Sequence, residues 1–102
     1  MPKKDYGNTI IYKIVCKNPM VKDFYIGYTT NLKVRKYNHK SNCNNANGDK
    51  YDFLLYKTIR KKGGWDNWEV LPVDKFDCKN VNEAEEIERS FINKYKPNLN
   101  DD

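Results

Sequence analysis

The sequence has 102 residues, of which 38% are hydrophobic and 32% are charged, so it specifies a small core under a heavily solvated surface. The net charge of +5 suits a polyanionic partner, and the length excludes a catalytic domain with a separate targeting module. No apolar run approaches the roughly 18 residues of a membrane span, so we expect no membrane partner.

The remaining global features concern domain number and compartment. We expect a single domain over residues 1–102, with its core at about 9–100. The N-terminal residues lack the apolar segment of a signal peptide, and the three cysteines have no metal-like spacing and suit reduced thiols. We therefore expect an intracellular protein, in the cytoplasm or in the nucleus of a host, that is not secreted.

The first predicted element is a β-hairpin. The segment Thr9–Cys16 is rich in β-branched and aromatic residues, residues 24–26 form a second short run, and turn-forming residues lie between them. Each strand carries a tyrosine, Tyr12 and Tyr25, and Gly27 ends the second strand. Two phenols on adjacent strands can face one pocket, although a strand tyrosine taken alone is more often part of the core.

A short helix is predicted next, at about residues 30–40. Thr29 or Thr30 can cap its N-terminus. Arg35 and His39 are four residues apart and so lie on the same side of this helix. A polar stripe beside a hairpin is unusual for core packing, and it indicates either a functional face or ordinary solvent-exposed residues.

A polar loop and a second helix follow. Residues 41–50 are rich in asparagine and are typical of a flexible loop. Asp49 can cap a helix at about residues 50–62, which has a semi-apolar face and a basic C-terminal end. The pair Gly63-Gly64 is expected to end it.

The last third of the chain predicts a strand and a third helix. Trp68 and the residues after it favour a strand, and Pro72 places that strand at a sheet edge or marks its end. Asn80 or Asn82 can cap a helix that runs to about Tyr95. The predicted order is ββααβα, an α+β fold with a small three-stranded antiparallel sheet and three helices.

One carboxylate interrupts the apolar side of the last helix. At about 100° per residue, Glu88 falls between Ala84, Phe91 and Tyr95, with the other charged residues outside this arc. A buried carboxylate is costly to desolvate without a partner. Glu88 therefore predicts a buried ion pair with Arg35 or a lysine, a position at the rim of the core, or a cleft in which it binds a divalent metal.

These features together resemble the GIY-YIG nuclease superfamily, in the form of a stand-alone catalytic domain with the same α+β fold. Ile10-Ile11-Tyr12 stands where that family has Gly-Ile-Tyr, and Tyr25-Ile26-Gly27 matches the second half of its signature. Arg35 and His39 match its arginine and the histidine or tyrosine one helical turn later. The last part of the chain matches the family pattern at Glu83, Ala84, Glu88, Ile92, Pro97 and Asn100.

Three positions depart from the patterns seen in members of the family. Ile10 replaces the glycine, Lys50 stands where some members have a histidine, and Tyr28 stands where some have a lysine. The last two positions vary within the family, so we expect an active enzyme. They leave open whether His39 or Tyr28 assists the proton transfer.

The resemblance implies a metal-dependent DNA endonuclease that leaves 5′-phosphate and 3′-hydroxyl ends. Glu88 would bind a single Mg²⁺ (or Mn²⁺), Arg35 would contact the scissile phosphate, and Tyr12 would take the proton from water. A phenol with a pKa of ~10 is a poor base at neutral pH, so a cation must lower that pKa. The other implied site residues are Tyr25 to orient water or phosphate, His39 to relay the proton or bind phosphate, and Gly27, Tyr28 and Asn100 in support.

DNA affinity is expected to come from phosphate contacts of basic side chains. The candidates are Lys33, Lys36, Lys40, Lys57, Arg60, Lys61 and Lys62. Nothing resembles a base-reading module, so specificity would depend on DNA structure, a second subunit or a specificity partner. Two other functions fit the sequence: a non-catalytic basic nucleic-acid-binding module of the same fold, and a protein-interaction domain with a solvated basic face.

Overall fold

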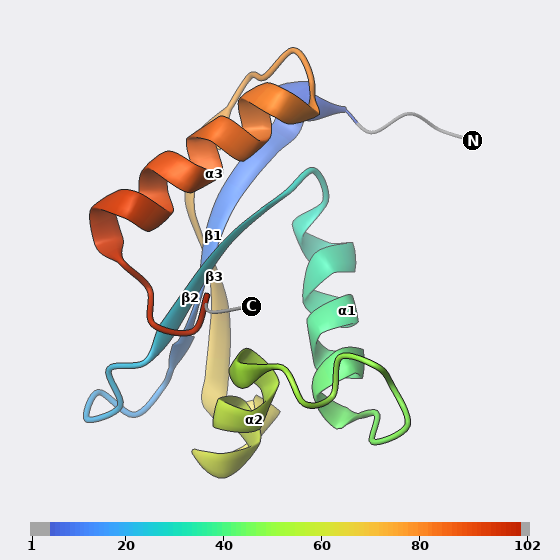
Figure 1. The fold of residues 1–102 in the computed structure, drawn as a ribbon, viewed down its shortest axis with the longest axis vertical. Coiled ribbons are helices and arrows are strands. Elements are labelled where there is room, and N and C mark those ends of the chain that lie inside the picture. Colours follow the sequence, from blue (N-terminus) through green and yellow to red (C-terminus); the bar gives the residue numbers. More distant parts are fainter. Residues whose placement is uncertain (1–4, 101–102) are drawn as a thin grey trace.

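The computed structural model describes residues 5–100. It contains a three-stranded antiparallel sheet with strand order β2-β1-β3, and three α-helices in the chain order ββααβα. Figure 1 shows α3 along one side of the sheet and α1 and α2 on the other. The elements are the 3-10 turns Tyr6–Asn8 and Trp65–Asn67, strands β1 Thr9–Cys16, β2 Phe24–Thr29 and β3 Trp68–Phe76, and helices α1 Leu32–Asn44, α2 Leu54–Lys61 and α3 Val81–Tyr95.

The expected α+β fold is confirmed, and several element boundaries differ from prediction. Strand β2 continues to Thr29, which pairs with Ile10, so neither predicted threonine caps α1. Instead, the side chain of Asn31 accepts a hydrogen bond from the backbone N–H of Val34, and α1 continues to Asn44, beyond the predicted residue 40.

The start of α2 was predicted too early. Residues 46–53 form turns, α2 begins at Leu54, and Phe53 occupies the N-cap in place of Asp49. The helix does end before the glycine pair, and Gly63 and Gly64 both have positive φ angles of 105° and 82°. Glycine has no Cβ, so it adopts this backbone conformation without strain.

Strand β3 passes through Pro72 and continues to Phe76. Its position at the edge of the sheet explains why proline is tolerated, because a proline has no N–H to donate to a neighbouring strand. Opposite Pro72 lies Tyr12, and the register of the pair shifts between Ile11 and Tyr12. The prediction of an edge strand is therefore correct, and the alternative that Pro72 marks its end is wrong.

The two faces of the sheet are covered by different helices. Tyr12 and Ile14 of β1 pack with Leu55, Tyr56 and Ile59 of α2, all of them buried. The opposite face carries α3, where Phe91 contacts Phe76 edge-to-face. As predicted, Asn80 caps α3 and the helix ends at Tyr95, followed by Lys96 in a left-handed conformation. Among residues 5–100, we find no helix with both the length and the apolar character that a membrane crossing requires.

Candidate active site

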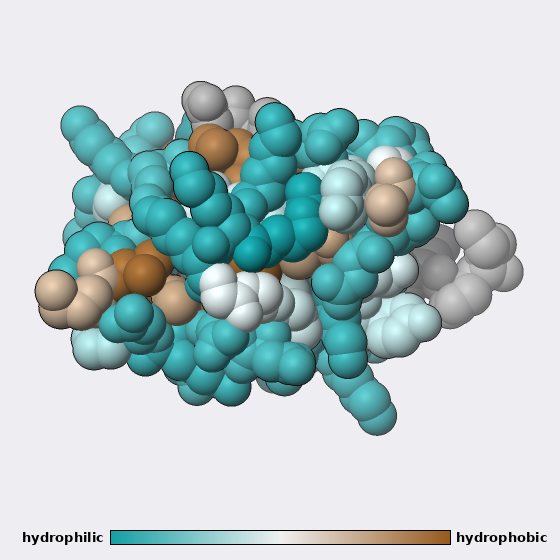
Figure 2. All heavy atoms as spheres, turned by 90° about the horizontal axis from the view of Figure 1, so that it is seen from below, coloured by the Kyte–Doolittle hydropathy of each residue, from teal (hydrophilic) through white to brown (hydrophobic). Residues whose placement is uncertain are grey.

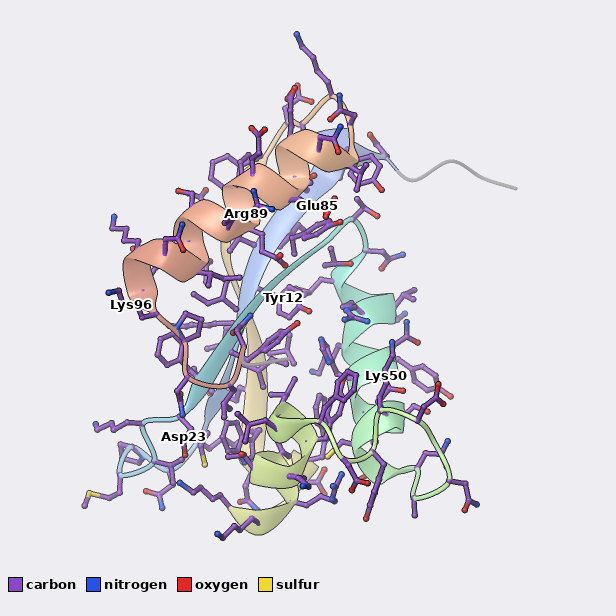
Figure 3. All side chains as sticks on the ribbon, in the orientation of Figure 1. Tyr12, Asp23, Lys50, Glu85, Arg89 and Lys96 are labelled. Atoms are coloured by element: carbon purple, nitrogen blue, oxygen red, sulfur yellow. The ribbon has the colours of Figure 1, made fainter. Side chains whose placement is uncertain are left out.

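The predicted catalytic residues lie around two adjoining hollows. The larger has a volume of about 480 Å³ and the smaller about 280 Å³. Tyr25 of β2, Arg35 of α1 and Glu88 of α3 line both of them. Tyr12 of β1 lines the larger hollow and His39 of α1 the smaller, so side chains from four elements meet in one place. Figure 3 shows Tyr12 at the middle of the sheet, on the side toward α1.

Tyr12 and Tyr25 reach the same face because of the strand register. Tyr12 pairs with Gly27, and Ile14 pairs with Tyr25. Directly opposite residues of an antiparallel pair project to the same side, and the next residue but one on each strand shares that side. The two phenol rings are consequently neighbours, with centroids 6.3 Å apart.

Gly27 leaves the space that the ring of Tyr12 occupies. A Cβ at position 27 would lie 2.6 Å from the hydroxyl oxygen of Tyr12, 2.7 Å from the ring carbon that bears it and 3.0 Å from Tyr25. Its φ is not positive, so glycine is required here by the close approach of the phenol and not by backbone conformation. The glycine of the second half-signature thus sets the position of the tyrosine of the first.

A buried hydrogen-bond chain runs through the site. The Tyr12 hydroxyl lies 2.7 Å from Nε2 of His39, and Nδ1 of His39 lies 2.7 Å from the Tyr56 hydroxyl. Nε of Arg35 donates to the Tyr12 oxygen at 3.3 Å. Tyr12 is 0% exposed, His39 1% and Tyr56 2%. Because a ring held at both nitrogens cannot rotate, His39 is fixed relative to both phenols.

Burial dominates the electrostatics of these groups. It raises the pKa of Tyr12, to which Tyr25 adds, while Arg35 acts in the opposite direction. Burial lowers the pKa of His39 to about 3, helped by the positive charges of Arg35 and Lys50. His39 is therefore a neutral imidazole at physiological pH. Burial also raises the pKa of Tyr25, against a smaller lowering by Arg35, whose positive charge favours the ionised form of both phenols.

Glu88 reaches the site at the free edge of β2. This half-buried carboxylate receives a hydrogen bond from the Tyr28 backbone, which lowers its pKa, but burial has the larger effect and raises it. The neighbouring N–H groups of the same edge donate to Asn98, from Phe24 at 3.0 Å, and to Asn100, from Ile26 at 2.8 Å. Asn100 also donates to the carbonyl of Ile26 at 2.6 Å. The segment after α3 therefore takes the place of a fourth strand at this edge, and its asparagines fix the backbone on both sides of Tyr25.

The donor set allows a single metal with few protein ligands. Among residues 5–100, no group of three or more His, Cys, Asp or Glu side chains can hold a metal ion. The one ion pair within the same range joins Lys62 to Asp23, so the Glu88 carboxylate has no cationic partner within ion-pair distance there. Mg²⁺ is usually bound by one or two carboxylates together with waters and substrate phosphates. Among residues 5–100, Glu88 is the one carboxylate that lines the two hollows, and it fits this arrangement.

The predicted DNA-binding residues differ in whether their side chains are exposed or bonded to other groups of the protein. Lys33, Lys36 and Lys40 are exposed along α1, and Lys57 and Lys61 are exposed on α2, at the end of the molecule where Figure 2 shows a largely hydrophilic surface. Arg60 instead donates to the carbonyls of Cys43 and Tyr51, both at 2.7 Å, and its guanidinium lies 3.5 Å from the ring centroid of Tyr51. Lys62 pairs with Asp23. Arg60 and Lys62 thus have structural contacts that the sequence did not indicate.

Two residues of the site were missed as site residues in the sequence. Tyr56 bonds His39, and Lys50 lines the smaller hollow from the segment that follows α1 (Figure 3). The helical periodicity around α2 predicted a semi-apolar face that did not include Tyr56, so it gave no sign that this phenol would contact a histidine. Lys50 drew attention only as a substitute for a histidine.

Comparison with known protein families agrees with this geometry. The family description of the GIY-YIG catalytic domain matches residues 8–100, nearly the whole chain. The protein belongs to the GIY-YIG family. No curated protein and no solved structure is similar enough to count as a match. Because this family consists of endonucleases, membership supports a nuclease-type function for this GIY-YIG domain. The departure at Ile10 does not reach the site, since Ile10 lines neither hollow.

Proposed function

We propose that this GIY-YIG domain is a metal-dependent DNA endonuclease that hydrolyses phosphodiester bonds with Tyr12 as general base and leaves 5′-phosphate and 3′-hydroxyl ends. The observation that supports it most is the meeting of Tyr12, Tyr25, Arg35 and Glu88 at one pair of hollows. A carboxylate and a guanidinium beside two phenols are not explained by core packing, because charged groups are costly to bury. Phosphodiester hydrolysis needs a base, a cation for the phosphate and a metal ligand.

Each side chain has a role that its surroundings permit. Glu88 would hold Mg²⁺ or Mn²⁺, which neutralises charge on the phosphate and on the leaving oxygen when it is bound. Arg35, half-buried and always protonated, forms a charge-assisted contact with the scissile phosphate. Tyr12 removes the proton of the attacking water, and Tyr25 orients that water or the phosphate.

The proposed partner is DNA, bound through its phosphates by the exposed lysines of α1 and α2. Such binding releases counterions, so affinity should fall steeply as salt rises. In this proposal the choice of DNA site depends on DNA structure, on a second subunit or on a specificity partner. The proposal also includes an intracellular location. A DNA affinity that does not change with salt concentration would contradict it.

The decisive experiment is plasmid nicking in Mg²⁺ by the wild-type protein and two glutamate variants. Glu88→Ala should abolish nicking and retain DNA binding, because it removes the metal ligand and no basic residue. Glu86→Ala is the matched control, since Glu86 is an exposed glutamate of the same helix. If Glu88→Ala nicks at the wild-type rate, Glu88 is not the metal ligand.

A second experiment concerns the base. Tyr12→Phe should slow cleavage by about a hundredfold or more, the usual contribution of a general base. Tyr37→Phe is the control, because Tyr37 is 70% exposed on α1. A near-normal rate for Tyr12→Phe would remove Tyr12 from this role.

The non-catalytic nucleic-acid-binding module remains the second candidate, and the complete burial of the Tyr12 ring is the observation in its favour. A general base must contact the attacking water, and Tyr12 lines the larger hollow although it is 0% exposed. Salt-sensitive DNA binding without nicking in Mg²⁺ or Mn²⁺ would establish this candidate in place of the nuclease.

A further inference from the structure

The hydrogen-bond chain through His39 extends beyond the residues that the proposed reaction uses. Tyr56 does not line the larger hollow with Tyr12, yet its hydroxyl lies 2.7 Å from Nδ1 of His39 and it is 2% exposed. Nδ2 of Asn42 donates to the same Tyr56 oxygen at 3.5 Å. A buried phenol that contacts a buried histidine constrains which ring nitrogen carries the proton.

Asn42 and Arg35, at the two ends of this hydrogen-bond chain, contribute N–H groups, which can only donate. Donation at both ends leaves one of the two phenol hydrogens, that of Tyr12 or that of Tyr56, without an acceptor among the bonded groups. That hydrogen needs water, and Tyr12 but not Tyr56 lines the larger hollow, which favours the direction in which the hydrogen of Tyr56 points at Nδ1 of His39. Nδ1 is then an acceptor, so the proton of a neutral imidazole resides on Nε2 and points at the oxygen of Tyr12.

We propose that Tyr56 is a positioning residue that holds His39 in the Nε2-protonated form, so that two N–H groups, from His39 and Arg35, meet the oxygen of Tyr12. Within residues 5–100, the hydroxyl hydrogen of Tyr12 is then the one hydrogen of this hydrogen-bond chain that has no acceptor in the protein. That hydrogen is the one that Tyr12 must lose before it can act as a base.

The catalytic consequence rests on the proposed function. Tyr12 releases its proton to solvent in the larger hollow, and two N–H donors stabilise the phenolate that remains. The phenolate then takes one proton from the attacking water and returns to the phenol. His39 stays neutral throughout, because an imidazolium next to Arg35 in a buried site is unfavourable, as its lowered pKa indicates.

The first test is the tautomer of His39 in the wild-type protein without metal or DNA. The sequence contains a single histidine, so the imidazole ¹⁵N signals in an NMR spectrum belong to His39 alone. We expect the Nε2-protonated pattern at neutral pH. The Nδ1-protonated pattern, or an imidazolium, would overturn the proposal, and neither result depends on nuclease activity.

The second test is Tyr56→Phe, with Tyr37→Phe as a control on an exposed phenol. Loss of the donor to Nδ1 should yield a mixture of tautomers. It should also lower kcat by about tenfold to a hundredfold, the scale found when a group that orients a metal-ligating histidine is removed, without changing DNA affinity. An unchanged tautomer and an unchanged kcat would together refute the role of Tyr56.

A pH profile separates positioning from a general loss of structure. The groups that face Tyr12 and His39 are Tyr25, Arg35, Lys50 and Tyr56. Burial raises the pKa of Tyr12, so the phenolate is a minor form near neutral pH and kcat should rise with pH. Loss of one N–H donor at the Tyr12 oxygen in Tyr56→Phe should lower kcat along this rising limb, because less phenolate forms at each pH. A wild-type kcat that is independent of pH would contradict the proposal, and so would a Tyr56→Phe deficit that remains after both rates have levelled off. If the wild type does not nick DNA but shows the expected tautomer, the positioning role stands and the nuclease proposal fails.

Discussion

Gly27→Ala offers a sharp test of how the two half-signatures depend on each other. The new methyl group would lie 2.6 Å from the Tyr12 oxygen, whereas an ordinary contact begins at 3.4 Å. The phenol must therefore retreat by about 0.8 Å. Tyr12 is 0% exposed and its hydroxyl is bonded to His39 and Arg35, so a movement of this size disturbs both hydrogen bonds.

Two effects of Gly27→Ala follow from this displacement. Overpacking a well-filled core costs about 1–3 kcal/mol, which for a domain of this size lowers Tm by roughly 4–8 °C per kcal/mol. A misplacement of about 1 Å in a catalytic group costs on the order of a hundredfold in rate. DNA affinity should be unchanged, because Gly27 lies on β2 away from the exposed lysines of the helices.

The measurements for Gly27→Ala are Tm by circular dichroism and kcat by plasmid nicking in saturating Mg²⁺. Gly48→Ala is the control, because a Cβ there first meets Asn45, its side chain at 3.1 Å and its backbone oxygen at 3.3 Å, in a loop that lines neither hollow. The control should retain both Tm and kcat. A Gly27→Ala protein with wild-type Tm and a rate within about threefold of wild type would refute the claim that Gly27 makes room for the base.

Three further predictions concern stability and DNA binding. Asn100→Ala removes the acceptor of the Ile26 N–H and should lower the free energy of unfolding by about 1–2 kcal/mol in urea titrations; an unchanged value would show that water replaces the amide. Arg60→Ala loses two carbonyl contacts and should destabilise the fold by about 1.5–3 kcal/mol, whereas Lys57→Ala should leave stability unchanged and reduce the salt slope of DNA binding by about one; equal effects on stability would contradict this assignment. The pKa of His39 is lowered from 6.5 to about 3, so the unfolded chain binds more protons below pH 6.5, and the free energy of unfolding should fall as the pH drops from 6.5 toward 3, by at most about 1.4 kcal/mol per pH unit. His39→Gln should show a weaker pH dependence of stability in this range. An identical dependence would mean that other groups cause it.

Local sequence signals predicted the elements that depend on local geometry. A run of β-branched and aromatic residues identified β1 in full, and Asn80 was correctly among the expected caps of α3. The boundaries that failed were decided by neighbours. Thr29 pairs with Ile10 in the sheet, so its backbone is not available to begin α1, and Asn31 takes that role.

The helix expected from residue 50 shows the same competition. Arg60 donates to the carbonyl of Tyr51, a contact between a helix and the loop before it that periodicity cannot indicate. Helix α2 begins at Leu54, one residue before its first buried residue, Leu55. Similarly, Arg60 and Lys62 looked like DNA-binding residues on composition alone, and the fold assigns both of them partners within the protein.

Periodicity along the chain was enough to place several site residues in relation to one another. The helical period placed His39 one turn after Arg35 and Glu88 within an apolar arc. That Tyr12 and Tyr25 could share a pocket was a possibility from the sequence, and the register of β1 and β2 decided it. The tertiary structure alone decided that Tyr56 would bond His39 and that Glu88 would meet the edge of β2. Such contacts join segments far apart in sequence, and their formation depends on how helices and strands pack together, which no local pattern of residues encodes.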